Sequence, residues 1–107
     1  MRTINFNVND TIIRKNSLSD FSNLSKEPSV QVIFSFSEEW DDYVKVAEFK
    51  RDGKELEPQV LLHGTTCEIP SEALKGNFLQ ISILGKRGED RRKTRCLLVN
   101  TNEKLRR

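Results

Sequence analysis

The chain has 107 residues, close to the commonest size of a single folded domain and too few for two hydrophobic cores. Its charged fraction of 32% and apolar fraction of 36% predict a folded globule with a well-solvated surface. No run approaches the roughly 18 apolar residues of a membrane span, and the opening segment MRTINFNVND lacks the apolar centre of a signal peptide. We therefore expect one domain over residues 1–100 and a polar, basic tail over residues 101–107.

The net charge of +2 hides a gradient along the chain. Residues 1–85 hold nine basic and thirteen acidic side chains, whereas residues 86–107 hold nine basic and three acidic ones. Such asymmetry indicates a basic end that faces a partner, although a solvated charged face explains it more simply.

Alternation of apolar and polar residues dominates the first third of the chain. It runs from residue 3 to residue 8, and the turn-forming pair Asn9-Asp10 leads into a second extended run at 11–13, which predicts a hairpin. Residues 15–28 are polar and rich in serine, with apolar residues at every third position. This spacing fits either one helical turn or a long loop that is held to the core by its apolar residues, and we favour the loop. The residues are Leu18, Phe21 and Leu24.

The middle of the chain contains the clearest strand, residues 29–37, which places Phe34 and Phe36 on one face. A second strand is predicted over residues 43–51, ended by the turn pair Asp52-Gly53. Between them lies the segment SEEWDD, where we expect Trp40 to fill the core at the crossover.

The last third of the chain predicts short elements. Extended runs at 59–63 and 66–69 precede a helix of one or two turns at 70–76. Strands at 78–84 and 94–99 are expected to pair across a loop of residues 85–92.

Seven or eight short strands with turns between them are typical of an all-β domain, either a small antiparallel β-sandwich or a small barrel. We favour the sandwich, with one short helical turn. The predicted core consists of Phe6, Val32, Phe34, Phe36, Trp40, Phe49, Ile69, Ile81, Ile83 and Leu98.

The residues that usually carry catalysis are scarce. His63 is the only histidine, so no relay or metal site can use two imidazoles. Cys67 and Cys96 lie in apolar runs, where we expect both thiols to be buried and inert; whether they pair with each other stays open. The expectation is a protein that is not an enzyme and has no catalytic, cofactor-binding or metal-binding residues.

Four carboxylates surround Trp40 and form a candidate acidic patch. Paired carboxylates can serve acid/base catalysis, bind a hard cation, or imitate the phosphates of a nucleic acid. The spacing of a calcium loop is absent, so we favour a structural interpretation in which they face water. The patch consists of Glu38, Glu39, Asp41 and Asp42.

A cluster of basic residues is the stronger candidate for partner binding. On a hairpin it could contact phosphates or an acidic protein, but it lacks interleaved aromatic residues and a glycine-rich phosphate loop. Glu89 and Asp90 also weaken its field. The cluster consists of Lys86, Arg87, Arg91, Arg92, Lys93 and Arg95.

Three segments, quoted in chain order, resemble a known family: VIFSFSEEWDDYVKVAEF, CEIPSEAL and LQISILGKRGEDRRKTRCLLV. Their order and spacing are similar to the N-terminal domain of siphophage baseplate upper proteins and related minor tail proteins from phages of Gram-positive bacteria. The opening INFNVNDTIIR also fits, so the resemblance covers nearly the whole chain. The matching positions are Phe34, Phe36, Trp40, Phe49, Ile69, Pro70, Leu74, Gly85 and Thr94.

This resemblance implies a β-sandwich that attaches to a baseplate core, works as a homo-oligomer and carries no catalytic site. The chain would occur in the host bacterial cytoplasm during expression and in the virion tail once assembled, with no membrane partner.

Family members continue into a helical or fibrous segment, whereas the printed sequence ends at Arg107. A second function therefore stays open: a stand-alone phage-encoded binder of a host factor, for example an inhibitor of a nuclease-type defence system. Its partner-binding element would be the basic cluster or the acidic patch. Direct nucleic-acid binding is a lesser alternative.

Overall fold

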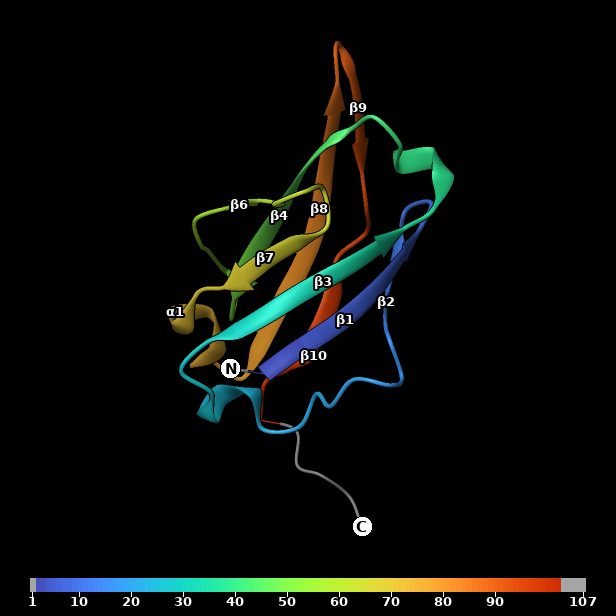
Figure 1. The fold of residues 1–107 in the computed structure, drawn as a ribbon. Coiled ribbons are helices and arrows are strands. Elements are labelled where there is room, and N and C mark those ends of the chain that lie inside the picture. The colour runs from blue at the N-terminus through green and yellow to red at the C-terminus, as the bar shows by residue number, and fades with distance from the viewer. Residues whose placement is uncertain (1, 103–107) are drawn as a thin grey trace.

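The computed structural model describes residues 2–102, which form two β-sheets packed face to face (Figure 1). Sheet A contains β1 (Arg2–Asn9), β2 (Ile12–Lys15), β3 (Val30–Phe36) and β7 (Thr66–Ile69). Sheet B contains β4 (Val44–Arg51), β5 (Lys54–Glu55), β6 (Gln59–Val60), β8 (Phe78–Arg87), β9 (Asp90–Lys93) and β10 (Leu97–Asn100). The only helical elements in this part of the chain are η1 (Leu24–Lys26), η2 (Glu38–Trp40) and α1 (Ser71–Leu74), none of which could cross a bilayer.

The expected all-β fold is confirmed, with ten strands within residues 2–102 rather than seven or eight. Sheet A has the order β2-β1-β3-β7, and sheet B the order β10-β8-β4-β5, with β6 beside β4 and β9 beside β8. All of these pairs are antiparallel except β1 and β3. The loop after β2 returns the chain to the starting end of β1, so β3 runs in the same direction as β1.

The first hairpin forms as expected, with Asp10 in the left-handed conformation at φ 54°. Apolar residues of β1 face the core because the strand alternates with period two. Phe6 lies directly opposite Phe34 in the register, and their stacked rings are 5.5 Å apart.

The loop between β2 and β3 is held to the core by Phe21 and Leu24, both buried. Leu18 was expected to do the same, and that prediction is wrong, because 95% of its surface is exposed. Its backbone N–H donates to Asn16 Oδ1 at 2.9 Å, in a local turn that leaves the side chain in water.

Trp40 fills the core where the chain passes from sheet A to sheet B, as predicted. Its side chain is fully buried, and Nε1 donates a hydrogen bond to the Asp10 carbonyl at 2.8 Å. Gly85 gives the ring its space, since a Cβ there would lie 2.9 Å from Trp40 Cζ3. The residues around the indole nitrogen therefore join the first hairpin to the crossover.

Of the ten predicted core residues, eight are buried and Phe36 packs against the core while partly exposed. Leu98 is the error: it is 54% exposed, and Val99 is buried in its place. Residues 97–99 are all apolar, so alternation cannot decide which of them face inward. The register decides it, since Leu98 lies opposite Gln80 on the outer face of sheet B.

Residues 85–92 do not form the predicted loop. Strand β8 continues to Arg87, turns through Gly88-Glu89 with Gly88 at φ 59°, and returns as β9, so the hairpin extends beyond the rest of the sandwich (Figure 1). The ladder then breaks at Thr94, whose Oγ1 accepts the Ile83 N–H at 2.9 Å. After this break, the Arg95 N–H donates to the Thr11 carbonyl at 2.8 Å, and β10 rejoins β8.

The elements between β4 and β8 are short: each of β5, β6, β7 and α1 has two to four residues. Only Gln59–Val60 of the run 59–63 is a strand, and the helix expected over 70–76 is the single turn α1, which buries Ala73 and Leu74.

The predicted tail begins inside the fold. Thr101 is buried, its N–H donates to the Asn77 carbonyl, and its own carbonyl accepts the Ser25 N–H at 2.8 Å. Asn102 Nδ2 donates to Asn77 Oδ1 at 2.7 Å. The remainder of the predicted tail, 103–107, lies outside the described residues.

Candidate functional site

The β8–β9 hairpin divides the basic cluster between its two faces. Side chains alternate along each strand, and residues opposite each other in the register share a face. Arg92 lies opposite Gly85 and Arg87 lies opposite Asp90, and all four face inward. Lys86 lies opposite Arg91 on the outer face, where Lys93 also lies.

The two inner arginines are held by the fold itself. The Arg87 guanidinium carbon lies 4.7 Å from the Tyr43 ring centroid, and its Nη2 lies 3.5 Å from Asp90. Arg92 lies 5.8 Å from the ring centroid of Trp40 and pairs with Asp10 at 3.0 Å. These contacts explain their positions without a ligand.

The outer bases and Arg95 differ in whether they have an acidic partner within residues 2–102. Lys93 pairs with Glu48 at 3.2 Å. Lys86, Arg91 and Arg95 are exposed, and no carboxylate among residues 2–102 lies within ion-pair distance of them.

The acidic patch lies on and beside η2, with all four carboxylates exposed. The pKa of Glu39 is below its usual value, chiefly because the Ser37 side chain hydrogen-bonds to it, with smaller help from its own backbone N–H and from Arg92. No group of three or more metal-ligating side chains occurs in the part of the chain that the structure describes. The patch consists of Glu38, Glu39, Asp41 and Asp42.

The two thiols differ, which corrects the expectation that both are buried. Cys67 is buried on the inner face of sheet A, and burial raises the pKa of its thiol to about 12. Cys96 is exposed at the break between β9 and β10, so its apolar neighbours in sequence were misleading. Neither forms a disulfide. His63 is exposed in the left-handed conformation, at φ 53° in the turn before β7.

The outer face of sheet B carries apolar side chains that were not among the candidate site residues predicted from the sequence. Val46 lies opposite Val60 on one side and Leu84 on the other, and Val44, two residues earlier in β4, lies on the same face. Val44 and Val60 are 62% and 63% exposed, whereas Val46 and Leu84 are partly buried. We call these four residues the outer strip. The sequence contains a sign of this strip, because the run YVKVAEF (residues 43–49) has apolar residues on both faces of a strand.

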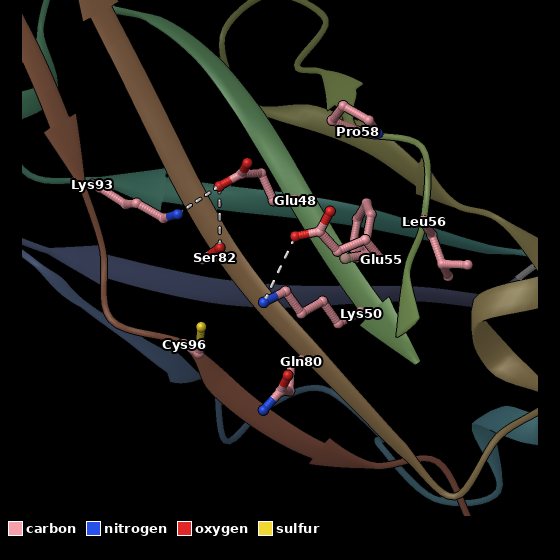
Figure 2. A pocket seen from close by; sticks show the side chains of 10 residues that line it. Glu48, Lys50, Glu55, Leu56, Pro58, Gln80, Ser82, Lys93 and Cys96 are labelled. Carbon is pink, nitrogen blue, oxygen red and sulfur yellow. Dashed lines mark hydrogen bonds and ion pairs between the residues drawn. The ribbon is translucent and has the colours of Figure 1, made fainter. Parts of the chain in front are cut away.

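A pocket of about 190 Å³ lies next to the outer strip on the same face. Figure 2 shows Glu48 between Lys93 and Ser82, and Lys50 pointing to Glu55. Ligand pockets for cofactors are usually about 300–1,000 Å³, so this one has room for little more than one side chain. Its lining comprises Glu48, Phe49, Lys50, Glu55, Leu56, Pro58, Gln80, Ser82, Lys93 and Cys96.

Comparisons with protein-family models, curated proteins and solved structures found no match to this chain.

Proposed function

We propose that this chain is a protein–protein interaction module of a phage or prophage that serves tail baseplate assembly or attachment. The observation that carries the protein-binding half is the outer strip, since exposed apolar residues gathered on one face mark interaction sites. Val44 and Val60 are each more than 60% exposed there, beside the hairpin bases. The baseplate half comes from the resemblance, which also implies a homo-oligomer.

The test is co-expression with the tail proteins encoded near its gene, followed by size-exclusion chromatography with light scattering. We expect a complex of defined mass, and the chain alone measured in the same way reports its oligomeric state. Val44→Asp combined with Val60→Asp should prevent the complex by placing charges within the outer strip. Leu18→Asp is the matched control, because Leu18 is 95% exposed in the loop before β3. Absence of any complex with tail proteins would contradict the baseplate assignment.

We also propose that the module has no catalytic role and needs no cofactor. The Cys67 thiol supports this view, since its raised pKa keeps it protonated at neutral pH and thus a poor nucleophile. The exposed carboxylates of the acidic patch lack the burial that tunes a general acid.

A second candidate function is a stand-alone binder of a host factor, such as an inhibitor of a nuclease-type defence system. The exposed pair Lys86 and Arg91 favours it, because these bases have no partner among residues 2–102. Such a binder should associate with a purified host nuclease in a salt-sensitive way. Direct nucleic-acid binding is less favoured, because Arg87 and Arg92 are engaged by aromatic rings and carboxylates. A gel-shift assay at low salt tests it.

A further inference from the structure

Lys86 of β8 and Arg91 of β9 lie directly opposite each other on the outer face of sheet B. Like charges at opposed positions destabilise a sheet, so this pair is unfavourable for the isolated domain. Both side chains are exposed, and among the described residues neither has a carboxylate within ion-pair distance. Folding of the described residues gives no reason for two bases here.

Elsewhere on the same face, the basic side chains of cross-strand neighbours are paired with carboxylates, or the neighbours are apolar. Lys50 lies opposite Glu55 and pairs with it at 3.9 Å, while Lys93 pairs with Glu48. Between these ion pairs and the opposed bases lies the outer strip. Its Val44 shares a row with Lys86, so the unpaired positive charges border the apolar surface directly.

The pocket beside the strip adds a place for an anchoring side chain. It lies between the Lys93–Glu48 and Lys50–Glu55 ion pairs, and Leu56 and Pro58 form its apolar walls (Figure 2). Residues that contribute most to protein–protein affinity typically fill such small pockets.

We propose that the outer strip and the Lys86–Arg91 pair bind one partner, a protein segment whose aliphatic side chains are bordered by carboxylates. This inference rests on the proposed protein-binding function and names the chemistry of its partner. Carboxylates placed over the two bases would cancel their repulsion, and the aliphatic side chains would remove the strip from water. The positive charges of Lys86 and Arg91 thus favour a partner that carries carboxylates beside its aliphatic side chains.

Two other occupants fit this face less well. A nucleic acid would neutralise Lys86 and Arg91 but would leave the outer strip exposed. A second copy packed through the same face would bring carboxylates that are already paired, since Glu48 pairs with Lys93 and Glu55 with Lys50, so it offers Lys86 and Arg91 no free carboxylate from these rows.

The first experiment measures the thermal stability of the free domain. Lys86→Glu creates an opposite-charge pair with Arg91 and should raise Tm by about 1–5 °C at low salt. Arg14→Glu, on exposed β2 of sheet A, is the matched charge control and should not raise Tm. A lower Tm for Lys86→Glu would show that Lys86 stabilises the free fold and would overturn the inference.

The second experiment maps binding by NMR, using a peptide of alternating glutamate and valine as the probe. We expect amide shifts on β4, β8 and β9 at the outer strip, and an affinity about tenfold lower for the glutamine–valine peptide. Lys86→Glu and Val60→Thr should each weaken binding about fivefold or more, whereas Leu18→Ser should not. Shifts confined to other strands, or equal affinity for the two peptides, would refute the inference.

Duplex DNA is the competing probe. If DNA binds through Lys86 and Arg91 with an affinity that Val60→Thr leaves unchanged, and the acidic peptide does not bind, the face is a nucleic-acid site and the inference fails.

The outcomes also separate this inference from the proposed function. If the complex with tail proteins forms equally well with Lys86→Glu and Val60→Thr, the chain is an assembly module that uses another face. If no tail protein binds but the peptide behaves as expected, the baseplate assignment fails and the partner chemistry holds.

Discussion

The side chain of Arg92 lies over the indole of Trp40, with its guanidinium carbon 5.8 Å from the ring centroid. The same guanidinium pairs with Asp10 at 3.0 Å, and the Asp10 carbonyl accepts the hydrogen bond from Trp40 Nε1. The hairpin, the crossover and the first turn are therefore joined through three side chains. Arg92, which the sequence places in the basic cluster, is therefore partly buried and held against Trp40 at this end of the molecule.

Neighbouring arginines of β9 should consequently differ in their effect on stability. Arg92→Ala removes the cation–π contact and the ion pair, and should lower the free energy of unfolding by about 1–2 kcal/mol. Arg91→Ala, on the outer face, should change it by less than about 0.5 kcal/mol. Urea denaturation of the two variants checks this, and equal losses would disprove the division of the hairpin into two faces.

Truncation of the buried indole should be among the most damaging single changes. Trp40→Ala should cost about 3–5 kcal/mol, because it leaves a cavity between the sheets and an unpaired Asp10 carbonyl. Trp40→Phe retains part of the ring volume and should cost less. Thermal and denaturant unfolding measure both, and unchanged stability of Trp40→Ala would contradict its role at the crossover.

The hydroxyl of Thr94 takes the place of a backbone acceptor in the ladder to β8. Thr94→Val preserves shape but leaves the buried N–H of Ile83 without its 2.9 Å partner, so the expected loss is about 1–3 kcal/mol. Thr94→Ser keeps the hydroxyl and should lose less. Hydrogen exchange at the Ile83 amide provides a local readout: exchange should accelerate in the valine variant and stay slower in the serine variant.

Burial of Cys67 should make stability depend on alkaline pH. The folded-state pKa of about 12 exceeds the ordinary value of 9.0, so between these values the unfolded chain loses the thiol proton and the folded chain keeps it. Stability is therefore full below pH 9 and falls as the pH rises, by up to about 1.4 kcal/mol per pH unit.

The matched variant for this pH effect is Cys67→Ala, which removes the titrating thiol. Its stability should decline less steeply than that of the wild type between pH 8 and pH 10.5, whatever its stability at neutral pH. Parallel curves would show that the thiol ionises equally well in both states.

Much of the fold followed from local sequence. The period-two pattern of residues 3–8 and 30–36 places Phe6 and Phe34 in the core, and the turn chemistry at Asn9-Asp10 and Asp52-Gly53 ends strands where the structure ends them. The position of Trp40 between two predicted strands also indicates that it fills the core at the crossover, and its side chain is fully buried there. These features depend on residues that are close in the chain, so they can be predicted from the sequence.

The errors arose where local sequence fits two arrangements equally well. Leu97 and Leu98 are chemically alike, and only the pairing with Ile81 and Gln80 turns Leu98 outward. Cys96 follows the same pattern, because the break at Thr94 leaves it exposed in an apolar run. Leu18 fits an apolar spacing but lies in a turn that points to solvent.

By itself, the sequence determined an all-β domain with its core strands, and it marked the basic cluster as the segment most available to a partner. Only the tertiary structure decided which bases are available. The register of β8 with β9 turns Arg87 and Arg92 onto aromatic rings and leaves Lys86 and Arg91 opposed on the outer face. The physical reason is the alternation of side chains in a strand: a shift of one residue exchanges the two faces, and the pairing of β8 with β4, which packs Gly85 against Trp40, sets which face turns inward.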